Sequence, residues 1–525
     1  MQIQDMQIND MQTDEITISQ LWDRRAAGDP DHVYCRFGDE SWTIGRLDAA
    51  INRLANALLA TGLKQGDRVA VMLPSHPEHI IVIFALAKAG LLRIPVNTHL
   101  KGAALDFVFD RFEPHALIAD AAYAEPLVPV LGRLPELAVF WRGGEGAQSL
   151  ASLQERGSPL PPPVTVAADD IIAITPSSGT TGEPKGVLKT DRSLRAGPMG
   201  TLALTGAGAG DVFLLWEPLH HGAGVAVLIA ALMQPITLAM VEKFSASQFW
   251  EQVRRFDVTH IHYLGGVLPL LLKQPASPRD REHKVRMAWG GGCPLDVWRA
   301  FEERFGVSLY EGYGLSEMTT FVTINPEGRL GSCGRPLPFY EVRLLDEAGA
   351  EVAVGEPGEI VVLPREPGLA FKGYFRMEEA GEALVRDGWF STGDLARRDE
   401  DGFLYYCGRK KDSVRRRGVN ISAWEVERVV LTHDEIEECA LIGVPSEMGD
   451  DDLKLFIRPA PGRALDPAGL VAWCEQRLPY FQIPRYIEGI DEFPKTPTQR
   501  IRKSELSRSV AACFDREGAG SKLGR

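Results

Sequence analysis

The chain has 525 residues, of which 45% are hydrophobic and 24% are charged, which is typical of a globular protein too long for one ordinary core. Its formal net charge of −14 argues against a polyanion-binding surface, so we expect neither nucleic acid nor anionic membrane as a general partner. The seven scattered cysteines show no C-x-x-C spacing that would indicate zinc or a redox pair, and they fit a reducing, cytoplasmic location.

The first half of the chain alternates strand-like and helix-like segments. Residues 1–15 are polar and acidic, lack the apolar core of a signal peptide, and are expected to form a disordered tail. β-Branched runs then alternate with amphipathic runs, as in DRVAVML, HPEHIIVIFALAKAG and LRIPVN, and again through DVFLLW, ITLAMV, VTHIHYL and VRMAWG. This pattern predicts an α/β fold of helix-covered parallel sheets. Lys88 and the pair Gln234-Pro235 interrupt the most apolar runs, so we expect no membrane span.

The second half differs in character. From about residue 335 the strands are shorter, which predicts a β-rich subdomain, and after GRKKDSVRRRG a run of helix, strand, strand, helix and strand extends from Trp424 to about Ile490. We therefore predict a large N-terminal domain over residues 16–410, a small mobile α+β domain over residues 411–510, and a disordered tail over residues 511–525.

The strongest local motif is SSGTTGEPKG, which runs from Ser177 to Gly186 and follows the apolar run DDIIAIT. Glycines among hydroxyl residues let backbone amides and side chains converge on an oxyanion, and Lys185 adds positive charge. A Walker A loop is excluded because Pro184 and Gly186 stand where that motif demands glycine and a hydroxyl residue. A flexible surface turn is the plain alternative to a phosphate loop.

This loop resembles the phosphate loop of the adenylate-forming (ANL) superfamily, and the likeness continues in order through EPLHHGAG, GGGCPL, YEGYGLSE, WFSTGDLARRDEDGFLYYCGRKKD and RRRGVNISAWEVE. The motifs cover roughly Trp22 to Leu506 and are most similar to the crotonobetaine/carnitine-CoA ligase group. Such enzymes join a carboxylate to ATP, release pyrophosphate, and pass the acyl group to a thiol. The resemblance therefore implies an acid–thiol ligase that uses ATP or the AMP moiety of an acyl-adenylate, coenzyme A and Mg²⁺.

The residue types support a nucleotide site independently. Tyr313 offers a ring face for adenine, Glu311 can accept from its amino group, and Glu317 is a hard carboxylate suited to Mg²⁺. One carboxylate can accept from both ribose hydroxyls, the role that the resemblance implies for Asp394, although a Thr-Gly-Asp run is usually only a turn. The nucleotide-binding residues implied are Ser178, Gly179, Thr180, Thr181, Gly182, Lys185, Gly292, Cys293, Pro294, Glu311, Gly312, Tyr313, Gly314, Ser316, Asp394 and Arg409.

The resemblance also implies residues for the thiol-transfer step. His221 matches the aromatic gate between the carboxylate pocket and the incoming thiol; the pair His220-His221 could instead pack or bind metal, but no third ligand has suitable spacing. The small domain would pivot at Lys411. The basic run after it could be a solvated face; the resemblance assigns coenzyme A contacts to Arg415, Arg416, Arg417 and Gly418 and acyl-pocket walls to Val225, Tyr263, Gly265 and Gly266.

One loop departs from the family. In PKTPTQRIRKSEL, Gln499 and Arg500 occupy positions where the family usually carries Gly-Lys, and that lysine bridges carboxylate and phosphate oxygens during adenylation. Arginine keeps the charge but is bulkier and differently directed, and misplacing one such contact costs about 100- to 1000-fold in rate. Lys503, three residues on, would be aimed elsewhere. We therefore expect weak adenylation, with His221, Glu317 and Arg500 as the candidate catalytic residues.

Three interpretations stay open: an enzyme limited to thioester formation, a complete acyl-CoA synthetase, and a silent adenylate-binding protein or amide-forming ligase. A full motif set without the lysine resembles the non-adenylating type of acyl-CoA ligase found in platensimycin and platencin biosynthesis. That resemblance implies antibiotic biosynthesis, a diterpenoid acid and a separate adenylating partner that supplies the adenylate.

Overall fold

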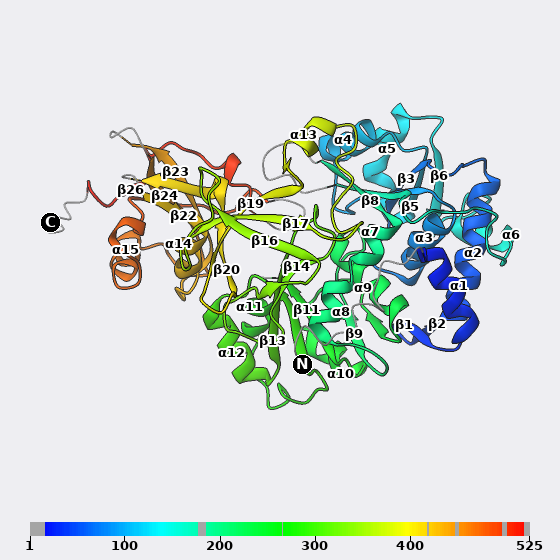
Figure 1. Ribbon diagram of the computed structural model, residues 1–525, viewed down its shortest axis with the longest axis horizontal. Helices are drawn as coiled ribbons and strands as arrows, with labels where there is room; N and C mark the ends of the chain where they lie inside the picture. Colours follow the sequence, from blue (N-terminus) through cyan, green and yellow to red (C-terminus); the bar gives the residue numbers. More distant parts are fainter. Residues whose placement is uncertain are drawn as a thin grey trace. The chain divides into compact units, whose positions relative to one another are not determined.

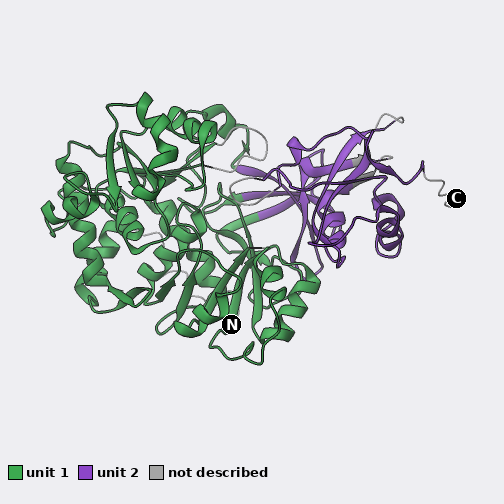
Figure 2. Ribbon diagram, turned by 180° about the vertical axis from the view of Figure 1, so that it is seen from behind, with its two compact units in different colours: residues 1–177, 184–341, 363–388 green, residues 178–183, 342–362, 389–525 purple. Residues whose placement is uncertain are grey.

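The computed structural model describes residues 16–176, 185–264, 266–416, 419–446, 451–495 and 501–518. Its chain divides into two compact units: unit 1 comprises residues 1–177, 184–341 and 363–388, and unit 2 comprises residues 178–183, 342–362 and 389–525 (Figure 2). The predicted boundary at residue 410 falls within unit 2 and stays a prediction. The predicted fold class, helix-covered sheets followed by a small α+β region, is confirmed.

Unit 1 contains a six-stranded sheet with the order β6-β5-β3-β4-β7-β8. Neighbouring strands run parallel except for the antiparallel pair β7 and β8. The expected runs DRVAVML and LRIPVN form β3 and β4, and DDIIAIT forms most of β7. The strands are β3 (Arg68–Met72), β4 (Leu92–Pro95), β5 (Ala116–Asp120), β6 (Ala138–Arg142), β7 (Ile171–Pro176) and β8 (Gly186–Thr190).

A nine-stranded sheet, also in unit 1, has the order β15-β14-β13-β12-β11-β9-β10-β1-β2. The four predicted runs between residues 211 and 290 form β9 to β12, and each is followed by a helix as expected. The strands are β1 (Val33–Phe37), β2 (Glu40–Thr43), β9 (Val212–Leu215), β10 (Thr237–Met240), β11 (His260–Leu264), β12 (Met287–Gly291), β13 (Ser308–Gly314), β14 (Phe321–Ile324) and β15 (Arg335–Pro336).

The helices of unit 1 cover both faces of these sheets (Figure 1). On the first sheet, α4 and α5 pack on one face through a cluster with β3, β4 and β5. On the second sheet, α10, α11 and α12 pack on one face. The helices are α1 (Ile18–Gly28), α2 (Ile44–Ala60), α3 (Pro77–Lys88), α4 (Gly102–Phe112), α5 (Ala124–Arg133), α6 (Leu150–Arg156), α7 (Asp191–Ala196), α8 (Met199–Thr205), α9 (Gly222–Met233), α10 (Phe249–Arg255), α11 (Val267–Leu272), α12 (Leu295–Phe305) and α13 (Glu378–Glu382); the short strand β18 (Val385–Arg386) follows α13.

Local chemistry explains where the helices begin. Thr17 and Gln20 form a reciprocal capping box at the start of α1, which satisfies two backbone N–H groups that the first turn leaves unpaired. At α3, the His76 side chain accepts from the Glu78 N–H, and Pro77 occupies the first turn, where no backbone donor is needed. Every residue of α3 except Glu78 is buried, and apart from His79 and Lys88 the buried residues are apolar, as expected for a helix covered on all sides.

Unit 2 contains β19 (Trp389–Arg398), β20 (Leu404–Arg409) and most of β16 (Tyr340–Leu345) and β17 (Gly358–Pro364). A hairpin of β21 (Ser413–Arg416) and β22 (Val419–Ser422) follows. The expected run after Trp424 forms α14 (Ala423–Val430), β23 (Ile436–Pro445), β24 (Asp451–Pro459), α15 (Pro467–Glu475) and β25 (Tyr486–Gly489). Both helices pack on β23 and β24 through a buried apolar cluster.

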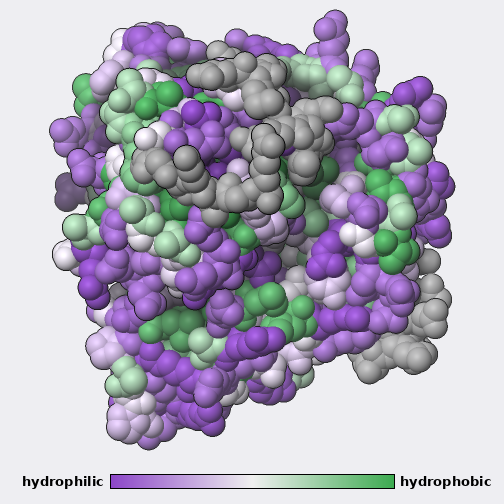
Figure 3. All heavy atoms as spheres, turned by 90° about the vertical axis from the view of Figure 1, so that its left-hand side faces the viewer, coloured by the Kyte–Doolittle hydropathy of each residue, from purple (hydrophilic) through white to green (hydrophobic). Residues whose placement is uncertain are grey.

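The carboxyl-terminal segment differs from expectation. Residues 511–525 were predicted to form a disordered tail, whereas β26 (Phe514–Asp515) pairs antiparallel with β25. The prediction is wrong for this strand because Phe514 packs against the apolar cluster of unit 2 and the strand pairs with β25, and composition reveals neither contact. Among the helices that the structure describes, none has both the length and the hydropathy needed to span a bilayer. Separately, Figure 3 shows one face of the molecule, on which hydrophilic residues surround small apolar patches.

Candidate active site

Four parallel strands of the nine-stranded sheet end at one edge. β9, β11, β12 and β13 are parallel to one another, so their carboxyl ends meet on the same side of unit 1. In open α/β sheets this edge is the usual place for ligands. His221 follows β9, Gly266 follows β11, Gly292 follows β12 and Glu317 follows β13. The fold therefore brings together four loops that are up to about a hundred residues apart in the sequence.

Glu311 is a buried carboxylate on β13, with 5% of its surface exposed. Its Oε1 accepts a hydrogen bond from the Tyr263 hydroxyl at 3.2 Å and another from the Cys293 backbone N–H at 2.6 Å. Burial and the neighbouring Glu311 raise the pKa of Tyr263, which therefore stays a neutral donor. Tyr263 thus orients Glu311, a role that its sequence position, 48 residues away, does not reveal.

The turn between β12 and α12 lies beside Glu311. Gly292 has φ +81°, a conformation that glycine adopts without strain, and Pro294 is the residue that precedes the first turn of α12. Tyr313, on β13, is 8% exposed. A Cβ at Gly312 would lie 2.9 Å from the ring of Phe321, so this position also requires glycine.

The turn that carries Ser316 and Glu317 is held from two sides. Lys189, on β8, donates from Nζ to the Ser316 carbonyl at 2.5 Å. The Tyr374 hydroxyl donates to Glu317 Oε1 at 2.7 Å, and the Phe371 N–H donates to the Glu317 carbonyl at 2.8 Å. The ammonium of Lys185 lies 4.6 Å from the centroid of the Tyr374 ring. Positive charge from Lys185 is therefore associated with the same turn as the predicted magnesium ligand.

Lys189 is a functional candidate that the sequence interpretation missed. The side chain is buried, and burial lowers its pKa to about 8, partly opposed by the nearby Glu317. The available signal was a lysine in an otherwise apolar strand, GVLKT, directly after the phosphate-loop motif. Tyr374 gave no such signal, because it lies 57 residues from Glu317.

The histidine pair lies at the start of α9. His221 immediately precedes this helix, and its ring centroid is 4.8 Å from that of His220. Burial lowers the pKa of His220 to about 3, so its ring is neutral at physiological pH. The buried guanidinium of Arg93 donates to the Leu219 carbonyl at 3.1 Å, which fixes the chain just before the pair. The candidate wall residue Val225 is buried in α9.

The loop before the pair has a second anchor. The buried carboxylate of Glu217 pairs with Nδ1 of His262 on β11 and accepts from the Trp216 N–H at 3.1 Å. The His221 segment is therefore held at both the β4 and β11 sides, through Arg93 and His262.

Magnesium is compatible with this arrangement at Glu317. The carboxylate is partly exposed, and one of its oxygens is oriented by Tyr374. Mg²⁺ is often held by one or two carboxylates together with substrate phosphates and water, so a single protein ligand fits this role. Across the residues that the structure describes, no group of three His, Cys, Asp or Glu residues is arranged to hold a metal ion without a substrate.

Unit 2 carries the predicted ribose-binding residue. Asp394 on β19 faces Arg409 on β20 in the strand register and is 6% exposed. Its Oδ1 accepts from the Tyr406 hydroxyl at 3.2 Å and lies 3.4 Å from Nε of Arg409. Although burial acts in the opposite direction, Asp394 raises the pKa of Arg409, which therefore keeps its charge. The pair that the sequence interpretation assigned to nucleotide is thus preassembled in one sheet.

The basic segment divides into different environments. Lys411, the predicted hinge, is exposed in a short 3₁₀ turn, whereas Arg416 is 2% exposed and ion-paired within unit 2. Arg417 and Gly418 lie outside the described residues, as does the side chain of Arg415. Further predicted site residues also lie outside the described residues: Ser178, Gly179, Thr180, Thr181, Gly182, Gly265 and Arg500.

The two lysines that flank residues 496–500 are engaged with carboxylates. Lys495 pairs with Glu438, and Nζ of Lys503 lies 2.7 Å from Oε1 of Glu427. Glu427 also accepts from the Leu441 N–H at 2.5 Å. Burial raises the pKa of Glu427, and Lys503 opposes this by stabilising the ionised carboxylate.

Comparisons with known proteins agree with the motif order. The sequence matches the family described as AMP-binding enzyme over residues 22–375 and the AMP-binding enzyme C-terminal domain over residues 425–500. It is 30% identical over 476 residues to a crotonobetaine/carnitine–CoA ligase of Citrobacter koseri, covering 88% of this chain and 92% of that one. The corresponding ligase of Salmonella paratyphi C is 29% identical over 508 residues, covering 93% and 98%.

Solved structures show the same fold. The o-succinylbenzoate coenzyme A synthetase of Bacillus subtilis, in complex with ATP and magnesium ion, superposes with a TM-score of 0.82. The two chains are 25% identical, and the match covers 93% of this chain and 98% of that one.

Proposed function

Because this chain belongs to the AMP-binding enzyme family and is an acid–thiol ligase of the acyl-CoA ligase type, we propose that it transfers an acyl group from an acyl-adenylate to coenzyme A, with weak or absent adenylation of its own. In unit 1, Glu311 and Tyr313 at the carboxyl end of β13 would contact the adenine base. In unit 2, Asp394 and Arg409 would contact the ribose. His221 would gate the pocket, and unit 2 residues after the hinge at Lys411 would receive coenzyme A.

The engagement of Lys503 carries the proposal of weak adenylation. The resemblance implies a lysine where this chain has Arg500, and Lys503 is the nearest lysine that could replace it. Its ammonium is paired at 2.7 Å with Glu427, whose pKa is raised by burial, so withdrawing Lys503 would leave a carboxylate in an unfavourable environment. Lys495, on the other side of the loop, is likewise paired with Glu438. These contacts favour Arg500 as the remaining charge carrier.

Two buried carboxylates, one in each unit, support binding of an adenylate. Glu311 in unit 1 and Asp394 in unit 2 are each buried and hydrogen-bonded, which supports their proposed roles at the base and at the ribose. Such preorganised groups lower the cost of binding because they need not be ordered by the ligand.

The finer substrate assignment rests on the likeness to the non-adenylating type of ligase. We propose that the acyl group is a diterpenoid acid in natural-product biosynthesis and that a separate adenylating enzyme supplies the adenylate. A complete ATP-dependent carboxylate–CoA ligase is the second candidate. It is favoured by relatives that match over nearly their whole length, including the Bacillus subtilis synthetase in complex with ATP and magnesium ion.

One comparison separates the two candidates. The unmodified protein is given coenzyme A with either free acid, ATP and Mg²⁺ or a synthetic acyl-adenylate of the same acid, and thioester formation is measured. We expect rapid thioester formation only from the adenylate. Equal rates from both would identify a complete synthetase, and no thioester from the adenylate across a panel of acids would contradict the proposed transfer.

A further inference from the structure

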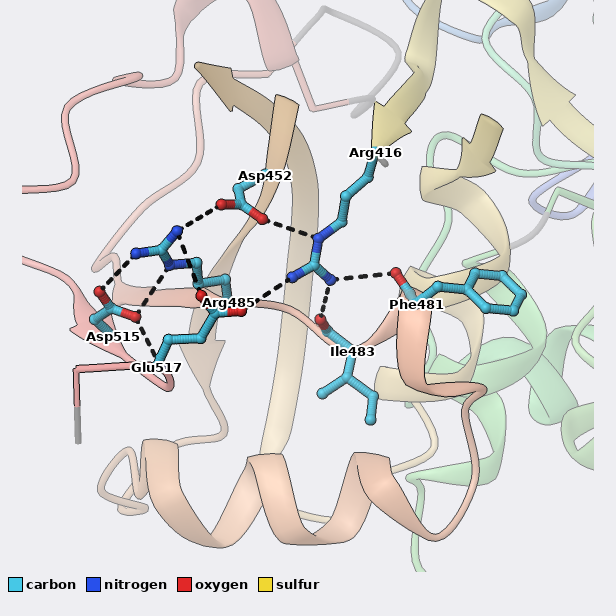
Figure 4. Close-up of polar contacts among 7 residues, drawn as sticks. All are labelled: Arg416, Asp452, Phe481, Ile483, Arg485, Asp515 and Glu517. Atoms are coloured by element: carbon cyan, nitrogen blue, oxygen red, sulfur yellow. Dashed lines mark hydrogen bonds and ion pairs between the residues drawn. The ribbon is translucent and has the colours of Figure 1, made fainter. Parts of the chain in front are cut away.

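The basic run after the hinge contains one arginine that is folded into the protein. Arg416 is the last residue of β21, and it is 2% exposed although both its sequence neighbours are also arginines. Its Nε donates to Asp452 Oδ1 at 2.9 Å, and its Nη1 donates to the carbonyls of Ile483 at 3.1 Å and Phe481 at 3.2 Å (Figure 4). One guanidinium thus joins the end of β21 to β24 and to the segment before β25.

The same aspartate connects Arg416 to the carboxyl-terminal segment. The other oxygen of Asp452 accepts from Arg485 Nη1 at 2.8 Å. Arg485 in turn donates to both oxygens of Asp515, at 3.3 and 3.4 Å, and lies 3.6 Å from Glu517. Glu517 closes the network with an ion pair to Arg416 at 3.8 Å. We call these five residues, Arg416, Asp452, Arg485, Asp515 and Glu517, the C-terminal clasp.

The contacts of the clasp depend on one another. Asp452 is 4% exposed and is shared by the two guanidinium groups, so losing either cation leaves a buried carboxylate partly uncompensated. Although burial acts in the opposite direction, hydrogen bonds from Arg485 lower the pKa of Asp515, as expected for a working ion pair. The backbone reinforces this connection, because the Arg516 N–H donates to the Arg485 carbonyl at 2.9 Å next to the β25–β26 pair.

We propose that Arg416 is a positioning residue rather than a coenzyme A contact, and that residues 515–517 complete a clasp that holds the β21–β22 hairpin for thioester formation. Arg417 and Gly418 directly follow Arg416, so anchoring β21 determines where the predicted coenzyme A segment begins. This role rests on the proposed function, because it concerns the segment that would receive coenzyme A.

The sign of one effect distinguishes positioning from direct contact. Coenzyme A carries anionic phosphates, so if Arg416 bound them, neutralising the nearby Glu517 would strengthen binding and lower the KM for coenzyme A. If the clasp positions the hairpin, neutralising Glu517 and Asp515 weakens that anchor and raises the KM. Arg416→Met raises the KM in both cases, so the acidic positions are the informative ones.

The test uses the full chain with a synthetic acyl-adenylate and coenzyme A. The double variant Asp515→Asn, Glu517→Gln is compared with unmodified protein and with the control Glu435→Gln, which removes an exposed carboxylate paired with Arg463 elsewhere in unit 2. We expect the double variant to raise the KM for coenzyme A about tenfold, because small displacements of positioned groups have effects of this order, while the affinity for the adenylate is unchanged. The control should match the unmodified protein.

Hydrogen exchange supplies a readout that does not depend on activity. Exchange of the peptide covering residues 413–422 should be faster in the double variant and unchanged in the control, whereas peptides of unit 1 should be unaffected. Unchanged exchange together with an unchanged or lowered KM would overturn the clasp. If the unmodified protein makes no thioester, the proposed function fails, and the exchange result alone still decides whether these residues hold the hairpin.

Discussion

Replacing Lys189 with methionine should change how the stability of the protein depends on pH. Methionine has a similar length and fills the same buried space without a charge. The wild-type lysine is 8% exposed and donates to the Ser316 carbonyl, and burial lowers its pKa from 10.5 to about 8. The substitution therefore removes both a buried charge and a hydrogen bond.

The expected magnitude follows from the two pKa values. A change from 10.5 to about 8 corresponds to about 3 kcal/mol of penalty on the charged form in the folded state. Below pH 8 the lysine is protonated in both states, and this penalty is fully present. As the pH rises toward 10.5 the folded state loses its proton before the unfolded state, so the wild-type protein becomes more stable. Between pH 7 and pH 9.5 the gain from this group is about 2 kcal/mol.

The assay compares urea unfolding of unit 1 in the two proteins at pH 7 and pH 9.5, with the exposed Lys284→Met as control. We expect the stability difference between wild type and Lys189→Met to shift in favour of wild type by about 2 kcal/mol at the higher pH. The control should show no such shift. A stability difference that is the same at both pH values would contradict the claim that burial lowers the pKa of Lys189.

Three further expectations concern other residues. Glu317→Ala should abolish ATP-dependent adenylation while sparing thioester formation from a supplied adenylate. Tyr374→Phe, which removes only the 2.7 Å hydrogen bond to Glu317, should reduce adenylation less. Equal loss of both half-reactions in Glu317→Ala would mean that Glu317 organises the pocket in general. Lys503→Met should lower the stability of unit 2 in chemical unfolding by about 1–3 kcal/mol, because it leaves Glu427 without its cation. The rate of ATP–pyrophosphate exchange should not change. A collapse of that rate would identify Lys503 as a catalytic lysine. Limited proteolysis should cut in the segment from Lys410 to Arg417 at its exposed start, Lys410 or Lys411, and release a fragment of about a hundred residues. Protection of these two lysines with cleavage elsewhere would contradict a mobile domain.

Much of the fold follows from local patterns. The runs DRVAVML and HPEHIIVIFALAKAG become β3 and α3 because alternation of buried strands and helices is encoded in short windows. The sequence also places Asp394 and Arg409 in neighbouring segments, and the antiparallel register of β19 and β20 brings them opposite each other.

Contacts between distant segments were not predictable in the same way. The basic run around Arg416 has the composition of a solvated surface, yet its central arginine is buried because Asp452 and two carbonyl groups surround it. Likewise the order of β26 depends on its pairing with β25, on Arg485 and on the packing of Phe514 against the apolar cluster of unit 2. Tyr374 and Lys189 reach the Ser316–Glu317 turn only after β8 and residues 371–374 have packed beside it.

The central claim is that Arg500 slows adenylation but not thioester formation. ATP–pyrophosphate exchange tests this claim most directly. Exchange is measured for the unmodified protein and for the double variant Gln499→Gly, Arg500→Lys, which restores the usual glycine and lysine together. We predict very slow exchange by the unmodified protein and a rise of about 100-fold or more in the double variant, the size expected for one electrostatic contact. Thioester formation from acyl-adenylate should be nearly equal in both proteins. Fast exchange by the unmodified protein, falling in the double variant, would contradict the account.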